Sequence, residues 1–217
     1  MIVDGMNYEE IQKEVLLDFD NMERYLHWKK KDISKFARRQ EKFPCTHIIE
    51  WTSPKKNRWI IMSVLFKKNI HNGGGAVMGA VIQKYPKGFA AHQVAINFSG
   101  WQYVTTYLPH FFDRYAERMN LDKTGVDLIK HFFRHNHVAD NDFTKTLSGK
   151  GSRDTDTIHM CFGEGVGMGQ VLSNRHALLK TFITYDMTSQ NQEEVFTDLR
   201  IDSKDYQEIH KRVWYGD

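Results

Sequence analysis

The chain has 217 residues, enough for one medium-sized domain with a buried core. Hydrophobic residues make up 41 % of it and aromatic residues 13 %, which excludes intrinsic disorder as the class of the protein. The formal net charge is +3, but residues 29–68 hold twelve Lys or Arg against three Asp or Glu, whereas residues 186–217 hold eight acids against four bases. The basic segment allows an anionic partner such as nucleic acid, although a solvated helix surface would carry the same charges.

The cysteine content and the N-terminus bear on the compartment. Cys45 and Cys161 are the only cysteines, too few for a disulfide framework or a zinc knuckle, which fits a reducing environment. The first residues turn acidic and lack the apolar stretch of a signal peptide. No apolar run approaches the roughly 20 residues that span a bilayer. We therefore expect a soluble cytoplasmic protein without a membrane partner.

Residues 7–40 have apolar side chains at three- and four-residue spacing, which predicts helix with one buried stripe. We expect two helices in this segment, and Pro44 ends it. The apolar positions are Tyr8, Ile11, Val15, Phe19, Met22, Leu26, Ile33 and Phe36.

Residues 46–98 are different in character, with short apolar segments rich in β-branched and aromatic residues and turn residues between them. This pattern predicts a four-stranded antiparallel meander. Gly73, Gly74 and Gly75 fit a hairpin tip, since no helix follows them that could bind a phosphate. His92 lies within an apolar strand segment and is interpreted as a core residue.

Helical character returns at Pro109, which fits the first turn of a helix because its missing N–H costs nothing there. A second helix is predicted from Thr124, where the sequence TGVD resembles a capping box with Asp127 in the third place. Its expected buried positions are Val126, Ile129, Phe132 and Phe133.

Three further strands are predicted at 157–162, 167–172 and 177–187, followed by an amphipathic helix at 192–214. The class is therefore α+β: N-terminal helices, an antiparallel meander, a helical pair, a second three-stranded antiparallel sheet region and a C-terminal helix. We divide the chain into an N-terminal helical region at 1–44 and an α+β domain at 45–217. The latter is divisible into a meander lobe at 45–100 and a catalytic lobe at 101–217.

The helix that begins at Pro109 carries the best candidate site. Successive residues rotate by about 100°, so His110, Arg114 and Arg118 fall on one face and form a column. A histidine can move a proton at neutral pH, and two arginines can hold a phosphate, which together suit phosphodiester cleavage without a metal. The alternative is an ordinary charged helix surface with weak i,i+3 and i,i+4 pairs.

The segment 177–187 alternates so that Thr181 lies on one face of a strand and Thr184 on the other. A helix with HFFDRYAER, a second helix and three antiparallel strands ending in KTFIT resemble the ribonuclease superfamily of barnase, the EndoU enzymes, the colicin nucleases and RelE-type toxins. The resemblance covers residues 107–190.

This resemblance implies metal-independent RNA cleavage with no cofactor. In it, His110 would be the general acid or base, Arg114 and Arg118 would hold the scissile phosphate, and Thr181 or Thr184 would help to position it. The candidates for a second proton-transfer group are His159 and His176.

A metal site is the rival hypothesis. His131 and His135 are four residues apart, so one helical face would present both. His137, Asp140 and Asp142 follow directly and could fold back onto them. A helix C-terminus that carries histidines for their favourable positive charge is the simpler explanation.

Three functions therefore stay open from the sequence. The first is a toxin-type ribonuclease that acts on RNA and is held by a protein partner or antitoxin. The second is a non-catalytic accessory factor, for example of a mobile element, that binds nucleic acid or an acidic protein through the basic segment. The third is a metal-dependent hydrolase built on His131, His135 and Asp140.

Overall fold

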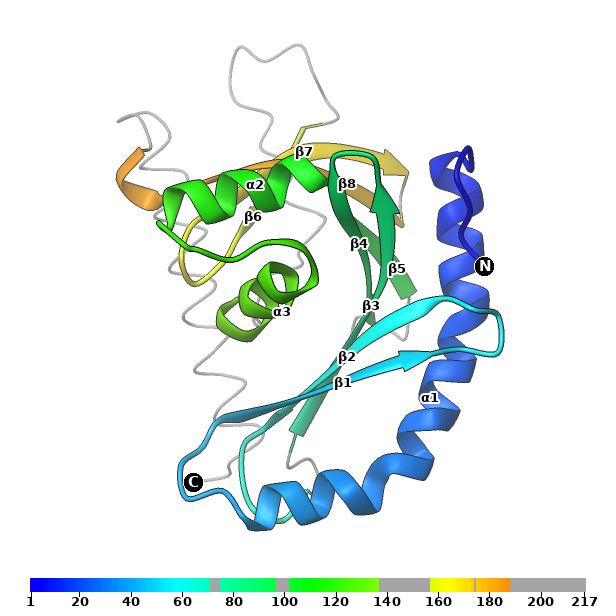
Figure 1. The fold of residues 1–217 in the computed structure, drawn as a ribbon, viewed down its shortest axis with the longest axis vertical. Helices are drawn as coiled ribbons and strands as arrows, with labels where there is room; N and C mark the ends of the chain where they lie inside the picture. The colour runs from blue at the N-terminus through cyan, green and yellow to red at the C-terminus, as the bar shows by residue number, and fades with distance from the viewer. Residues whose placement is uncertain (71–74, 97–101, 137–156, 174, 188–217) are drawn as a thin grey trace. The chain divides into compact units, whose positions relative to one another are not determined.

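The computed structural model describes residues 1–70, 75–96, 102–136, 157–173 and 175–187. Residue contacts divide the chain into two compact units, Met1–Lys84 with Ala90–Thr105 and Tyr85–Phe89 with Thr106–Asp217. The described residues form three α-helices and eight strands, so the predicted α+β class is confirmed (Figure 1). The strands are hydrogen-bonded in the order β1-β2-β3-β4-β5-β8-β7-β6. Their bounds are β1 Cys45–Thr52, β2 Arg58–Leu65, β3 Gly75–Tyr85, β4 Gly88–Ile96, β5 Gln102–Tyr107, β6 Thr157–Cys161, β7 Val166–Ser173 and β8 His176–Ile183.

Unit 1 begins with α1, Tyr8–Arg38, a single helix where the sequence led us to expect two. Its start is fixed by a capping box: Glu10 N–H donates to Asn7 Oδ1 at 3.0 Å, and Asn7 N–H donates to Glu10 Oε2 at 2.8 Å. No proline or glycine interrupts the helix, and the apolar stripe continues through Ile33, so nothing breaks it.

The core of unit 1 lies between α1 and one face of the strands. β1 pairs antiparallel with β2, and β2 pairs antiparallel with β3, as the meander prediction required. The sequence did not predict β5, which follows the four expected strands. Burial of each large apolar side chain here contributes roughly 1.5–3 kcal/mol. The cluster consists of Ile11, Val15, Phe19, Met22, Trp59, Ile61, Val81, Val94 and Val104.

One charged side chain, Asp18, lies completely buried beneath α1. Burial acts to raise the pKa of this carboxyl, but its hydrogen bonds together outweigh that effect and hold the pKa below the usual value. The network ties α1 to the β1–β2 turn and is structural, because solvent cannot reach it. The donors are Asn21 Nδ2 at 2.8 Å, Ser53 Oγ at 2.6 Å, Asn57 Nδ2 at 2.8 Å and Trp59 Nε1 at 2.9 Å.

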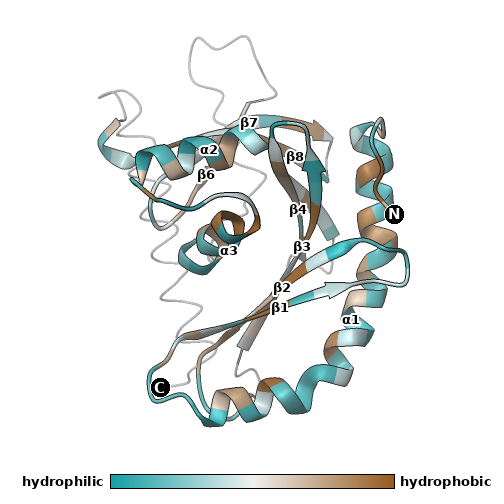
Figure 2. Ribbon diagram, viewed as in Figure 1, coloured by the Kyte–Doolittle hydropathy of each residue, from teal (hydrophilic) through white to brown (hydrophobic). Residues whose placement is uncertain are grey.

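Unit 2 contains α2, Pro109–Arg118, and α3, Gly125–His135, both close to their predicted positions. Pro109 occupies the first turn of α2, as expected. The predicted capping box of α3 is wrong: Thr124 is the N-cap residue, but its side chain makes no capping hydrogen bond. Val126 is only partly buried, and Leu128 is buried in its place. Figure 2 shows α3 hydrophobic on one side and hydrophilic on the other.

β6, β7 and β8 are antiparallel neighbours, as predicted for the last three strands. They do not form a separate sheet, because β8 also pairs with β5. Thr106 Oγ1 lies 2.8 Å from His176 Nε2, and Leu108 N–H donates to the Leu179 carbonyl at 3.0 Å. Residue numbers increase together along the two strands, from Thr106 beside His176 to Leu108 beside Leu179. β8 therefore runs parallel to β5.

An aromatic core joins the helices of unit 2 to its strands. The ring of Phe111 on α2 contacts Phe132 on α3 at 5.1 Å between centroids and Phe182 on β8 at 5.8 Å. Edge-to-face pairs of this kind add about 0.5–1.5 kcal/mol to the energy of burial. The rings hold α2 and α3 in fixed positions above β8, which positions the side chains described next. The other members are Tyr107, Phe112, Tyr115, Phe133 and Phe162.

Several predictions lie outside the described residues: Gly73 and Gly74 of the hairpin tip and the C-terminal helix at 192–214. In the ranges that the structure describes, no helix has the length and apolarity needed to cross a membrane. The buried histidine is confirmed: His92 is fully buried, and its Nε2 lies 3.0 Å from Gln83 Oε1.

Candidate functional site

The predicted column on α2 lies at the surface of unit 2. His110 is exposed, and Arg114 Nε–H donates to His110 Nε2 at 3.4 Å, a long hydrogen bond. Arg114 also forms an ion pair with Glu117 at 2.6 Å. Arg118 differs from both, because its Nη1 is buried and has no hydrogen-bond partner in the structure. The column thus exists, but Glu117 already pairs with its middle residue.

The strand threonines do not join this column. Thr181 is the register partner of Met168 and lies on the face of β8 opposite Phe182. Phe182 packs on Phe111 of α2, so Thr181 points away from that helix. Thr184 follows the end of β8 and is partly exposed. Within the described ranges, no hydrogen bond or ion pair links either threonine to the histidine or the arginines of α2.

The candidates for a second proton-transfer group lie inside the sheet. His176 is buried beside Thr106, and His159 on β6 is partly buried, which lowers the pKa of its ring. Neither ring lies on α2 or α3. Only two of the five metal candidates lie in the described part of the chain. His131 and His135 are on α3, whereas His137, Asp140 and Asp142 lie outside the described residues. Across the described ranges, no group of three or more His, Cys, Asp or Glu side chains could hold a metal ion.

The structure instead brings His131 together with residues that the sequence did not single out. The Tyr115 hydroxyl donates to Glu164 Oε2 at 2.6 Å, and its oxygen lies 3.1 Å from His131 Nδ1. Asn136 Nδ2 donates to the same carboxylate oxygen at 2.9 Å, and Glu164 N–H donates to Asn136 Oδ1 at 3.2 Å. We refer to Tyr115, His131, Asn136 and Glu164 as the α2–α3 cluster.

Each residue of the cluster is held by the local fold. Tyr115 is on the buried side of α2, His131 precedes the core residue Phe132 on α3, and Asn136 is the C-cap of α3. Glu164 lies in the β6–β7 turn, which Phe162 N–H closes by donating to the Gly165 carbonyl at 2.8 Å. A Cβ at Gly165 would lie 2.2 Å from the Ile183 carbonyl oxygen, so only glycine lets this turn approach β8.

The hydrogen bonds determine which nitrogen of His131 carries a proton. Tyr115 has one hydroxyl proton, and a carboxylate can only accept, so that proton lies toward Glu164. The contact with His131 therefore requires its Nδ1–H to donate to the tyrosine oxygen. In the neutral ring, Nε2 then has a free lone pair and makes no hydrogen bond within the described part of the chain.

The surroundings of His131 favour its neutral form. Burial lowers the pKa of the His131 ring, and the neighbouring charges of His135, Lys123 and Arg134 lower it further, whereas Glu164 opposes them. The pKa of the Tyr115 hydroxyl is raised, first by burial and then by its bond to Glu164, so it stays protonated and continues to donate. His131 is thus equipped to accept a proton at Nε2 near neutral pH.

A second imidazole lies against the first. The rings of His131 and His135 stack with centroids 4.1 Å apart and an angle of 28° between their planes. His135 Nδ1–H donates to the His131 carbonyl at 2.9 Å, which leaves its Nε2 outside that bond. Two imidazoles with their Nδ1 atoms engaged, close to the cations of Lys123 and Arg134, could transfer protons on an anionic substrate.

Only a weak indication of this cluster is present in the amino-acid sequence. His131 and His135 were recognised by their spacing, but as metal ligands. The helical periodicity that begins at Pro109 places Tyr115 on the apolar side of that helix, and no sequence pattern singles out Glu164. Comparisons with protein-family models, with curated proteins and with solved structures found no significant match to this chain.

Proposed function

We propose that the chain is a metal-independent ribonuclease of toxin type in which His131 is the proton acceptor. The observation that carries this proposal is the pair of hydrogen bonds made by the Tyr115 hydroxyl, to Glu164 on one side and to His131 on the other. It leaves Nε2 of a neutral histidine available. Tyr115 and Glu164 are positioning residues, since Tyr115 is fully buried and cannot touch a substrate.

The reaction follows from these protonation states. His131 Nε2 removes the proton of the RNA 2′-hydroxyl, the 2′-oxygen attacks the adjacent phosphorus, and the bond from phosphorus to the 5′-oxygen breaks. His135, in its protonated form, gives a proton to the departing 5′-oxygen, so the products are a 2′,3′-cyclic phosphate and a free 5′-hydroxyl. General acid–base catalysis of this kind contributes about 10²–10⁴-fold to a rate.

The surrounding charge suits a polyanion. Lys123 and Arg134 lie near enough to His131 to lower its pKa, and a bound phosphodiester would meet the same cations. We propose that the exposed face of α2, with His110 and Arg114, contacts the RNA backbone and does not transfer a proton. An antitoxin protein that covers the surface around His131 in the cytoplasm is the expected partner.

The deciding experiment is cleavage of a fluorescent RNA oligonucleotide in excess chelator, with wild type compared with His131→Gln. We expect cleavage by wild type and a loss of about 10²-fold or more in His131→Gln. His110→Ala should lower the rate only by weakening binding, and His27→Gln, an exposed histidine on α1, is the matched control. Equal rates for wild type and His131→Gln would refute the role of His131.

The stacked pair His131 and His135 also favours a second candidate, a metal-dependent hydrolase, because neither Nε2 atom is hydrogen-bonded to a described residue and both could bind one metal ion. The chelator separates the two: activity that disappears with chelator and returns with zinc would support the hydrolase. RNA binding without cleavage in either condition would support the non-catalytic accessory factor.

A further inference from the structure

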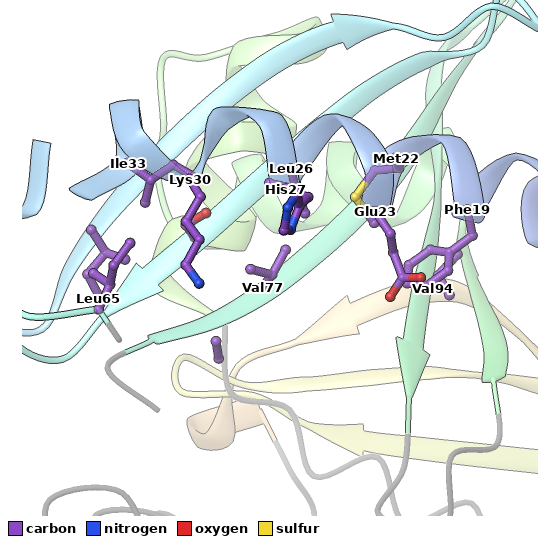
Figure 3. Close-up of a pocket in the computed structure, with 13 residues that line it drawn as sticks. Phe19, Met22, Glu23, Leu26, His27, Lys30, Ile33, Leu65, Val77 and Val94 are labelled. Carbon is purple, nitrogen blue, oxygen red and sulfur yellow. The ribbon is translucent and has the colours of Figure 1, made fainter. Parts of the chain in front are cut away.

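A pocket with a volume of about 470 Å³ opens in unit 1 between α1 and the strands. Figure 3 shows its lining residues on α1 above β3, with Val94 at one end and Leu65 at the other. The volume is within the range of about 300–1,000 Å³ that is usual for small-molecule sites. The lining is mainly apolar and includes Phe19, Met22, Leu26, Leu65, Val77 and Val94.

A buried hydroxyl without a partner lies among these apolar side chains. Ser63 is 1 % exposed, and its Oγ makes no hydrogen bond with any of the residues that the structure describes. Its strand neighbours Ile61 and Leu65 belong to the clusters that pack on α1, so the alternation of β2 points Ser63 at the same pocket. A buried unsatisfied hydroxyl costs about 1–3 kcal/mol, which a ligand with a hydrogen-bonding group would recover.

The mouth of the pocket is positively charged on the side near Ser63. Lys30 extends from α1 between Leu65 and Val77, whereas Glu23 lies at the other end near Val94 (Figure 3). Ser63 is the register partner of Val77, so it lies at the level where Lys30 overhangs the strands. Lys30 is exposed and makes no hydrogen bond or ion pair within the described part of the chain.

We propose that this pocket binds a medium-chain aliphatic carboxylate. Its alkyl chain would lie among the apolar side chains, and its carboxylate would accept hydrogen bonds from the Lys30 ammonium and the Ser63 hydroxyl. Such charge-assisted bonds are about twice as strong as neutral ones, and the removal of the chain from water adds roughly 0.8 kcal/mol per CH₂. The site belongs to unit 1 and is independent of the ribonuclease proposal.

The test is calorimetric titration of the full chain with decanoate, and with decanol as the ligand without a charge. We expect one saturable decanoate site and weaker binding of decanol. Lys30→Gln should weaken decanoate binding about tenfold, the loss of one charge-assisted bond, and Ser63→Ala should weaken it less. The matched control is Lys31→Gln, a neighbouring exposed lysine outside the pocket. Thermal unfolding verifies that each variant is folded.

Methyl NMR locates the ligand directly. Met22 lines the pocket, whereas Met187 is exposed in unit 2. Decanoate should shift the methyl resonance of Met22 and leave that of Met187 in place. The proposal is overturned if decanoate shows no saturable site, if decanol binds equally well, if Lys30→Gln binds as tightly as wild type, or if the Met22 methyl does not respond.

Discussion

Nδ1 of His131 lies 3.1 Å from the hydroxyl oxygen of Tyr115, although the two residues come from different helices. The same hydroxyl donates to Glu164, so it both fixes the histidine tautomer and connects the ring to a carboxylate. Because Tyr115 is fully buried, this relation is set by the packing of α2 on α3 and β8 and does not depend on solvent.

Tyr115→Phe tests the connection. The phenylalanine ring keeps the aromatic packing but leaves His131 Nδ1 and Glu164 without the hydroxyl, so we expect RNA cleavage to fall about tenfold or more in kcat with little change in KM. The free energy of unfolding should fall by about 1–2 kcal/mol. The control is Tyr185→Phe, which removes a hydroxyl that donates to the Phe162 carbonyl of the same turn at 2.6 Å. A control variant that loses as much activity as Tyr115→Phe would mean that the turn matters and the tautomer does not.

The pKa of His131 can be measured without an assay of RNA cleavage. Burial and neighbouring cations lower the pKa of its ring, so NMR should find a midpoint below the usual value of about 6.5. Glu164 acts in the opposite direction, so Glu164→Gln should move the midpoint to still lower pH. If cleavage depends on neutral His131, the acid limb of the kcat/KM profile shifts the same way. A wild-type midpoint above 6.5 would contradict the arrangement.

The sequence predicts the helices and strands of unit 2 better than the hydrogen bonds of its candidate site. The proline-initiated helix, α3 and the last three strands follow from proline placement and hydrophobic periodicity, which are local. Helical periodicity puts Tyr115 on the side of α2 opposite His110, Arg114 and Arg118, which is buried, but it could not show that its hydroxyl meets a carboxylate 49 residues away. Glu164 had no local pattern at all. Contacts between distant segments depend on how helices and strands pack, which one sequence does not reveal.

The errors in unit 1 have similar causes. The sequence predicts two helices within residues 7–40, yet α1 continues as one helix, since no residue there breaks it. The sequence does not predict β5, because its six residues, QYVTTY, show little alternation of apolar and polar side chains. Its strand identity comes from pairing with β4 and β8, which is tertiary information.

Ser63→Ala should stabilise the ligand-free protein. The substitution removes a buried hydroxyl that has no partner and leaves a side chain of nearly the same shape, so we expect a gain of about 1 kcal/mol in the free energy of unfolding. Ser53→Ala is the contrasting variant, because Ser53 Oγ donates to Asp18 at 2.6 Å and its loss should cost about 1–2 kcal/mol. Urea denaturation measures both. A loss of stability in Ser63→Ala would indicate that the hydroxyl is satisfied in solution.

Asp18 makes the stability of unit 1 depend on pH. Its folded-state pKa is lowered, since the hydrogen bonds to the carboxylate outweigh the effect of burial. A carboxyl with a depressed folded pKa contributes stability above its unfolded pKa of about 3.9, and that contribution is lost as pH falls through the folded pKa. Asp18→Asn should therefore lower the free energy of unfolding by about 1–3 kcal/mol at pH 7. The difference from wild type should shrink near pH 3.

Urea titrations of wild type and Asp18→Asn at both pH values measure this difference. The control is Asp20→Asn, an exposed neighbour on α1 whose loss should change stability by less than about 0.5 kcal/mol. A gap between wild type and Asp18→Asn that is equally large at pH 7 and near pH 3 would show that shape rather than charge determines the role of Asp18. If the difference in the free energy of unfolding is smaller near pH 3 than at pH 7, the stabilisation comes from the ionised carboxylate of Asp18. Only the charged form accepts hydrogen bonds from Ser53, Asn57 and Trp59 at full strength.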